Sequence, residues 1–149
     1  AVLPLLSEHG DLPPGIHSAD WAEIEARFGV STPARVRAFN KLKFLYKLAV
    51  LTGKLKRFFV FGSFVSDRAE PRDVDVALIM DADFEVEHCP RESQTLFSHA
   101  DADARFGASV FWLREGMLPD EVMQDFFDVW QTNRDGSKRG MLEVNNDSK

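Results

Sequence analysis

A short apolar run that ends at a Gly-Ser pair is the feature that most constrains the fold of this chain. Residues 58–61 (Phe-Phe-Val-Phe) are aromatic and β-branched, which is typical of a buried strand rather than of a helix. Gly62 ends the run, and because it has no Cβ it lets an anion approach the backbone closely. Ser63 adds a hydroxyl donor beside the amides of the turn. The pattern predicts a strand followed by a turn that can hold a phosphate without a basic side chain.

A second strand is predicted to begin at Asp73, which nine residues separate from Ser63. In residues 73–80 the even-numbered positions are all apolar and share one face, whereas Asp73 and Asp75 share the other. Two carboxylates at i and i+2 suit Mg²⁺, which takes oxygen ligands and keeps some of its waters. The alternative reading is a pair of solvated acids after an ordinary turn. The preceding strand and the Gly-Ser pair favour the metal site.

The combined spacing resembles a known signature. Phe61-Gly62-Ser63, nine residues and then Asp73-Val74-Asp75-Val76 are similar to the signature of the polymerase-beta-type nucleotidyltransferase superfamily. Further segments resemble a small bacterial family of unknown function placed within that superfamily, and with them the likeness extends over nearly the whole chain. These segments are residues 12–17, 21–25, 62–65 and 134–140.

The resemblance implies an α/β (α+β) fold, with a twisted mixed β-sheet flanked by helices. It implies that Gly62-Ser63 holds the β- and γ-phosphates of a nucleoside triphosphate, most simply ATP. Asp73 and Asp75 would be the catalytic metal ligands and would hold two Mg²⁺ ions. Ser66 and Arg68, in the loop that follows, are predicted to be weaker nucleotide contacts.

Active members of the superfamily usually supply a third carboxylate from a neighbouring strand. The best third strand here is residues 108–113, and the position expected for the acid is held by Ser109. Asp101 and Asp103 lie upstream of this strand and would reach the site only if the chain bends back. Without this third carboxylate, the sequence is compatible with an active enzyme and with a catalytically weak one.

Length and composition predict one domain over residues 1–149, with residues 1–17 as an extended, proline-containing arm. The chain is 44% hydrophobic and 28% charged, which suffices for a substantial core.

No apolar run approaches the roughly 20 residues that a membrane span needs. The start of the chain lacks the basic flank of a secretory signal, so a cytoplasmic location is expected. The single cysteine, Cys89, has no partner for a disulfide.

The net charge of −6 argues against broad, sequence-independent binding of nucleic acids, which depends on clustered Lys and Arg. Eight of the 18 basic residues nevertheless lie between residues 35 and 57, just before the predicted site. They form either a solvated helix face or a patch that reaches a triphosphate or an RNA end. They are Arg35, Arg37, Lys41, Lys43, Lys47, Lys54, Lys56 and Arg57.

The remaining elements follow from capping and periodicity. Asp20 and Glu23 form a capping-box pattern, and Thr32-Pro33 marks a second helix start. The predicted helices are residues 20–28, 33–51, 90–106 and 119–130, and the further strands are residues 108–113 and 141–144, the last at a sheet edge.

The predicted function is Mg²⁺-dependent transfer of a nucleotidyl group, AMP from ATP, to a hydroxyl. Small bacterial members of the superfamily resemble antitoxins that adenylylate a partner toxin, so a protein acceptor is expected. Transfer to an RNA end would require a basic patch that is continuous in space. The alternative function is a catalytically weak or inactive fold that binds a nucleotide or a partner protein.

Overall fold

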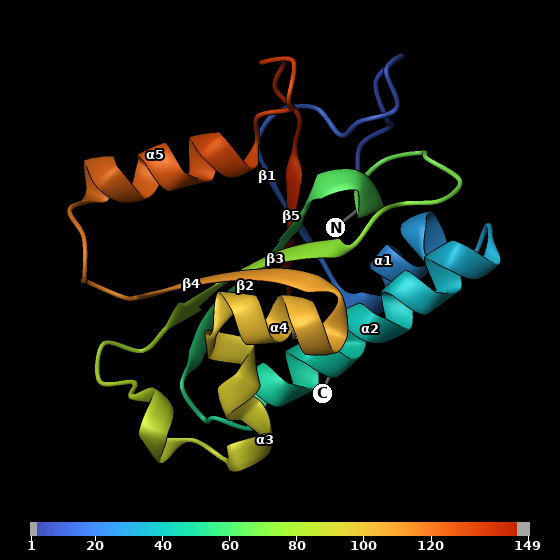
Figure 1. The fold of residues 1–149 in the computed structure, drawn as a ribbon. Helices are drawn as coiled ribbons and strands as arrows, with labels where there is room; N and C mark the ends of the chain where they lie inside the picture. Colours follow the sequence, from blue (N-terminus) through green and yellow to red (C-terminus); the bar gives the residue numbers. More distant parts are fainter. Residues whose placement is uncertain (1–2, 146–149) are drawn as a thin grey trace.

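The computed structural model describes residues 3–145 and contains a five-stranded mixed β-sheet flanked by helices (Figure 1). The strand order is β1-β5-β2-β3-β4. The elements are β1 Ile16–Ala19, α1 Trp21–Phe28, α2 Pro33–Val50, β2 Leu55–Phe61, the 3₁₀ turn η1 Gly62–Phe64, β3 Val74–Met80, η2 Val86–His88, α3 Arg91–Gln94, η3 Thr95–Phe97, α4 His99–Phe106, β4 Ala108–Arg114, α5 Asp120–Trp130 and β5 Met141–Val144.

Strand directions make the sheet mixed, as the sequence predicts. β2 is antiparallel to both β3 and β5, whereas β4 is parallel to β3 and β1 is parallel to β5. The prediction that residues 141–144 form an edge strand is wrong, because β5 lies between β1 and β2. The edge is β1, which begins at Ile16 inside the predicted arm. Backbone bonds from Met141 N to Gly15 O (3.0 Å) and from Asn145 N to Ala19 O (2.7 Å) hold the two parallel strands together.

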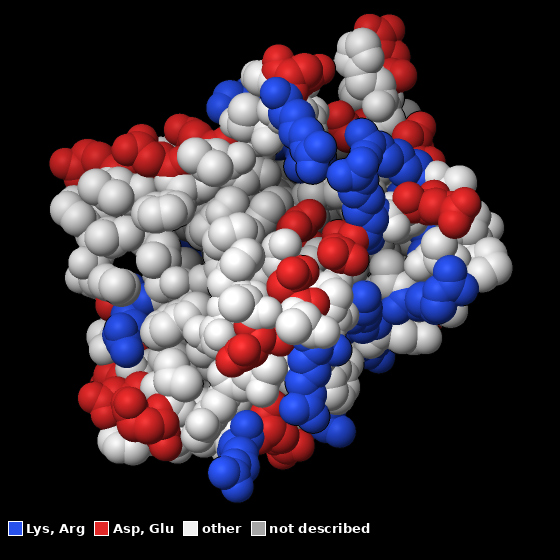
Figure 2. All heavy atoms as spheres, viewed as in Figure 1, with Lys and Arg blue, Asp and Glu red and all other residues white. Residues whose placement is uncertain are grey.

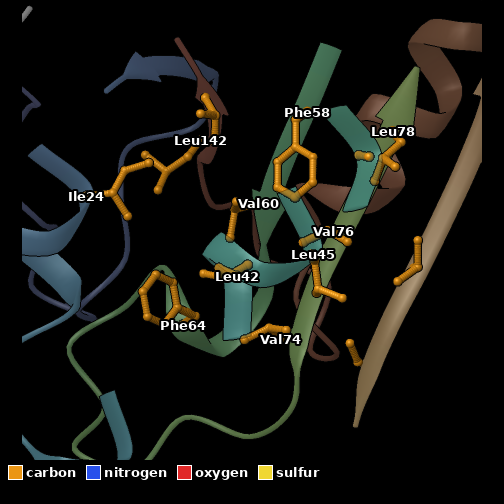
Figure 3. Packing of buried hydrophobic residues seen from close by; sticks show 14 of the residues in the cluster. Ile24, Leu42, Leu45, Phe58, Val60, Phe64, Val74, Val76, Leu78 and Leu142 are labelled. Atoms are coloured by element: carbon orange, nitrogen blue, oxygen red, sulfur yellow. The ribbon is translucent and has the colours of Figure 1, made fainter. Parts of the chain in front are cut away.

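The two faces of the sheet are covered unequally. Val74, Val76 and the other even-numbered residues of β3 face the larger core, which includes side chains from α1, α2, η3 and α4 (Figure 3). Ala77 and Ile79 face the smaller core. Of the described helices, only α5 covers this core. This alternation is the one predicted from the sequence of β3. The odd-numbered face, which carries Asp75, is therefore the more open of the two.

The predicted helix starts are confirmed by their caps. Asp20 Oδ1 accepts from Glu23 N at 2.8 Å while the Glu23 carboxylate accepts from Asp20 N at 3.1 Å. Thr32 Oγ1 accepts from Arg35 N at 3.2 Å, and Pro33 occupies the first helical position, where its missing N–H costs nothing. The helix predicted over residues 119–130 is present as α5.

The segment predicted to be helical, residues 90–106, is helical but divided into three pieces. The segment forms α3, η3 and α4, with Ser98 extended between η3 and α4 at φ −112° and ψ 113°. Ser98 Oγ accepts from Asp101 N at 3.3 Å and so starts α4 instead of continuing the helix before it. Serine side chains compete with the helix backbone in this way.

The N-terminal arm is packed on the domain over its described part, residues 3–15, and its first two residues lie outside the description. Leu3 and Leu12 are buried in the larger core. Asp11 forms an isolated antiparallel bridge with Ser66, in the loop after β2. None of the described helices is long and apolar enough to cross a membrane.

Arg35 of α2 is the most buried charged side chain that the structure describes, with 2% of its surface exposed. Its guanidinium donates to the carbonyl oxygens of Phe28 at 3.0 Å, Phe64 at 2.8 Å, Ser66 at 2.6 Å and Arg68 at 2.8 Å. Burial lowers the pKa of Arg35 from its usual value. Three of the four acceptors belong to the loop between β2 and β3, so Arg35 fixes the path of this loop and is not a solvated side chain.

We predict that Arg35→Met lowers the free energy of unfolding by about 2–5 kcal/mol, because it leaves buried carbonyl groups without donors. Denaturant unfolding measures this change, and amide hydrogen exchange should show faster opening of residues 64–72. Arg37→Met, at an exposed position of the same helix, is the control and should change stability by less than about 0.5 kcal/mol. Equal effects of the two substitutions would contradict the role of Arg35.

Candidate functional site

A cavity of about 760 Å³ opens where β2 ends and β3 begins. The two strands are antiparallel neighbours, with Phe61 paired to Asp75, so the turn after β2 and the acids of β3 meet at one end of the sheet. Five segments line the cavity: the arm (residues 7–11), the β2–β3 loop (62–73), the starts of β3 and β4, and the turn 133–139. Gly62, Ser63, Asp73 and Asp75 all contribute to its wall.

The turn requires glycine at position 62. Gly62 has a φ of +83°, which side chains other than glycine rarely adopt, and a Cβ placed there would overlap the Asp75 carboxylate. Ser63 Oγ accepts from Arg72 N at 2.9 Å, which closes the loop over nine residues. The turn and the acid are therefore in direct contact, and a bulkier residue would displace one of them.

Asp75 and Asp73 differ in their surroundings. Asp73 is exposed at the start of β3, whereas Asp75 is half-buried. Burial raises the pKa of Asp75 from 3.8 to about 6, the charge of Arg139 and the Ser109 hydroxyl oppose the rise, and the charge of Asp73 adds to it. Ionisation of Asp75 near neutral pH therefore carries a cost, which a cation bound at both carboxylates would relieve.

Ser109 occupies the place next to Asp75 on the adjacent strand. The register of the parallel pair β3–β4 sets Ser109 opposite Asp75, and both line the cavity. Asp101 and Asp103 lie on the exposed surface of α4, and neither lines the cavity. Within residues 3–145 no group of three or more His, Cys, Asp or Glu side chains is placed to hold a metal ion. The carboxylates of the proposed metal site are thus two.

Ser66 and Arg68 also line the cavity, but they take different positions in it. Ser66 is buried, and its hydroxyl donates to Ser63 O at 2.5 Å and accepts from Arg68 N at 3.3 Å. Arg68 is exposed. The Ser66 hydroxyl therefore holds the loop, whereas the Arg68 side chain is available to a ligand.

The sequence did not identify a second group of cavity residues, which comes from the turn before β5. Arg134, Lys138 and Arg139 line the cavity together with Asp11 of the arm. The charges of Asp11 and Asp75 raise the pKa of Arg139, while burial, the larger effect, lowers it. Arg139 Nε is buried and has no hydrogen-bond partner among residues 3–145. The Asp135-Gly136 pair predicts a turn, but the sequence does not reveal that this turn lies near the end of β2. That position results from the pairing of β5 with β2.

Most of the eight basic residues before the site are engaged elsewhere. Arg35 is buried, and three others form ion pairs near the start of β2, at the opposite end of this strand from Gly62. Lys41 Nζ donates to Gly107 O at 3.3 Å. The ion pairs are Lys54–Asp83 (3.0 Å), Lys56–Asp81 (3.9 Å) and Arg57–Glu143 (2.7 Å).

We predict that Gly62→Ala destabilises the protein more than Gly116→Ala does. Both glycines have positive φ, +83° and +76°, and a side chain there costs about 1–2 kcal/mol in either case. Only at Gly62 does the added Cβ also meet the Asp75 carboxylate, because nothing lies within 4 Å of a Cβ at Gly116. Denaturant unfolding of the two variants gives the difference. Equal losses would mean that the turn and Asp75 are not in contact.

Comparison with known proteins gives one match. Neither the curated proteins nor the solved structures contained a match to this chain. The sequence matches a protein family, described as a family of unknown function (DUF6932), over residues 4–145. This range includes every segment that lines the cavity. The chain therefore belongs to this family of unknown function.

Proposed function

We propose that the protein is an Mg²⁺-dependent nucleotidyltransferase that transfers AMP from ATP to a hydroxyl group of another molecule. The observation that carries the proposal is that Gly62-Ser63, Asp73 and Asp75 line one cavity at the same end of the sheet. The likeness of this spacing to the nucleotidyltransferase signature supports it. So does the five-stranded mixed sheet flanked by helices, which agrees with the expected nucleotidyltransferase fold.

The charges of the cavity suit a metal-bound triphosphate. Asp73 and Asp75 provide oxygen ligands for a hard cation that keeps several waters, and the open, polar cavity leaves room for those waters. When bound, Mg²⁺ would neutralise charge on the transferring phosphate and would favour the ionised form of Asp75. The two-carboxylate donor set and the raised pKa of Asp75 are both consistent with such an ion.

Basic side chains supply the opposite charge. Arg68, Arg134, Lys138 and Arg139 line the cavity with five aspartates, Asp73 and Asp75 among them. Figure 2 shows basic and acidic side chains close together over this end of the sheet. Guanidinium groups bind phosphate oxygens through paired, charge-assisted hydrogen bonds. We propose that these four side chains bind the phosphates. The backbone would come closest to the phosphates at the Gly62-Ser63 turn.

The acceptor hydroxyl would be activated weakly. Ser109 stands where a third carboxylate is expected, and its hydroxyl is not a base near neutral pH. General-base help is typically worth about 10²- to 10⁴-fold in rate. We therefore propose a slow enzyme. The alternative, a module that binds nucleotide without turnover, is favoured by Ser109 and disfavoured by the presence of both aspartates.

A protein is the better candidate for the acceptor. Binding of an RNA end would be helped by a continuous basic surface, and four of the eight basic residues before the site are held in ion pairs or buried. The net charge of −6 adds to this argument. ATP is the simplest nucleoside triphosphate to propose as the donor of the nucleotidyl group.

We predict that Asp73→Asn with Asp75→Asn abolishes Mg²⁺-dependent ATP binding and leaves the fold intact or slightly stabilised. The stabilisation is expected because the substitution removes a half-buried carboxylate whose ionisation carries a cost and which is repelled by its neighbour. Thermal unfolding with and without Mg²⁺-ATP measures the ligand-induced shift in Tm.

Asp101→Asn with Asp103→Asn is the matched control, since it removes the same spacing of acids from the exposed face of α4. This control should keep the full Tm shift of the wild type. An equal shift in all three proteins would contradict the assignment of Asp73 and Asp75.

We predict that Ser109→Asp raises the rate of nucleotidyl transfer by up to about 10²- to 10⁴-fold, because it sets a carboxylate beside Asp75 on the neighbouring strand. Ser109→Asn has a similar size and no base, and should leave the rate near that of the wild type. Transfer of labelled AMP from ATP in host lysate measures both. A fast wild-type enzyme that Ser109→Asp slows would overturn the role given to this position.

A further inference from the structure

An apolar surface lies beside the cavity on the face that α5 covers, and we call it the α5 surface. It consists of Phe111 of β4, Met117 in the following turn, and Val122, Phe126 and Val129 of α5. Their exposed fractions run from 36% for Val122 to 65% for Val129. Large apolar side chains that gather on one exposed face are typical of binding sites.

The α5 surface is one continuous patch. Met123, Phe127 and Trp130 pack α5 on the sheet, and the exposed apolar residues of α5 form the adjacent stripe at spacing i, i+4, i+7. The Trp130 ring lies 5.8 Å from that of Phe126 and 6.4 Å from that of Phe111. The buried Trp130 therefore joins the apolar stripe of the helix to the exposed aromatic ring of β4.

The next stripe around α5 is acidic. Glu121, Asp125 and Asp128 repeat the same spacing, Asp120 precedes them, and α5 contains no Lys or Arg. All four are exposed, and none forms an ion pair within residues 3–145. Figure 2 shows acidic side chains along the outer edge of α5 with uncharged side chains between them and the sheet. The complement of this surface is a segment that is both apolar and cationic.

The α5 surface borders the proposed active site. Phe111 follows Ser109 by two positions on the same face of β4, so the two residues lie about 7 Å apart. The Phe111 ring lies 6.1 Å from that of Phe61, the residue before Gly62. A chain held along α5 therefore reaches the cavity within a few residues.

We propose that the α5 surface docks the acceptor protein through a segment that combines apolar side chains with Lys or Arg, and so presents a nearby hydroxyl to the cavity. This inference rests on the proposed function. A second copy of this chain fits the surface less well, because a two-fold contact between α5 helices would bring like acidic rows together.

Two synthetic peptides of equal length test the proposal, one of alternating Lys and Leu with one Phe and one Ser, the other with Glu in place of Lys. Each is titrated into isotope-labelled protein and followed by NMR. We expect the Lys peptide to shift the amide signals of Phe111, Val122, Phe126 and Val129 saturably, with weaker binding as salt increases. The Glu peptide should shift none of them.

Variants separate the apolar and the charged contributions. Phe126→Ser with Val129→Ser, and Glu121→Lys with Asp125→Lys and Asp128→Lys, should each weaken the Lys peptide at least tenfold. Their controls are Phe44→Ser, at a side chain on α2 that is 47% exposed, and Asp101→Lys with Asp103→Lys on α4. Both controls should bind the peptide as the wild type does.

The outcomes distinguish this inference from the proposed function. Peptide binding that both α5 variants weaken, in a protein whose Tm does not respond to Mg²⁺-ATP, supports the docking surface and overturns the transferase. A normal response to Mg²⁺-ATP without saturable peptide binding at millimolar concentration, or with equal binding by all variants, overturns the docking surface. So does concentration-dependent dimerisation that Phe126→Ser with Val129→Ser abolishes, since a second copy would then be the occupant.

Discussion

The burial of one guanidinium, that of Arg35, governs the position of the cavity wall. A loop of this length could take many paths across the end of the sheet, yet its carbonyls at 64, 66 and 68 all accept from one buried side chain in the first turn of α2. Ser63 and Ser66 then close the loop on itself, and Asp11 ties the arm to it. The Gly62-Ser63 turn is thus positioned from the core side of the sheet, although the proposed ligand would lie on the other side.

Asp75 lines the cavity beside this framework. Its strand continues into the apolar layer of the sheet, which explains why its carboxylate is half-buried and why its pKa is raised to about 6. Because burial disfavours the ionised form of Asp75, positive charge nearby stabilises it. Arg139 supplies part of this positive charge, and the proposed metal ion would supply the rest. We therefore expect the proposed ligand to be an anion that arrives together with its cation, as a metal-bound triphosphate does.

Local patterns in the sequence predicted the parts of the site that lie within one strand or turn. The alternation of β3, the glycine after β2 and the capping residues of α1 and α2 are short-range signals, and each is present in the structure. Neither sequence interpretation of the set that contains Arg35, a solvated helix face or a patch for a phosphate or an RNA end, predicts its buried position, because a helix pattern does not reveal which polar side chain meets a carbonyl-rich loop. Arg139 and its neighbours were missed because their place in the cavity depends on β5 pairing with β2, a contact between residues more than eighty positions apart.

The insertion of β5 between β1 and β2 has a consequence for how the protein is made. β1 has no strand neighbour except β5, and β2 has only β3 until residues 141–144 are available, so the sheet stays divided until nearly the whole described chain has been synthesised. Pairings over such long sequence separations form late and slowly. The turn with Arg134, Lys138 and Arg139 arrives with β5, so a nascent chain would expose its two aspartates before it acquires three of the four basic residues assigned to the phosphates.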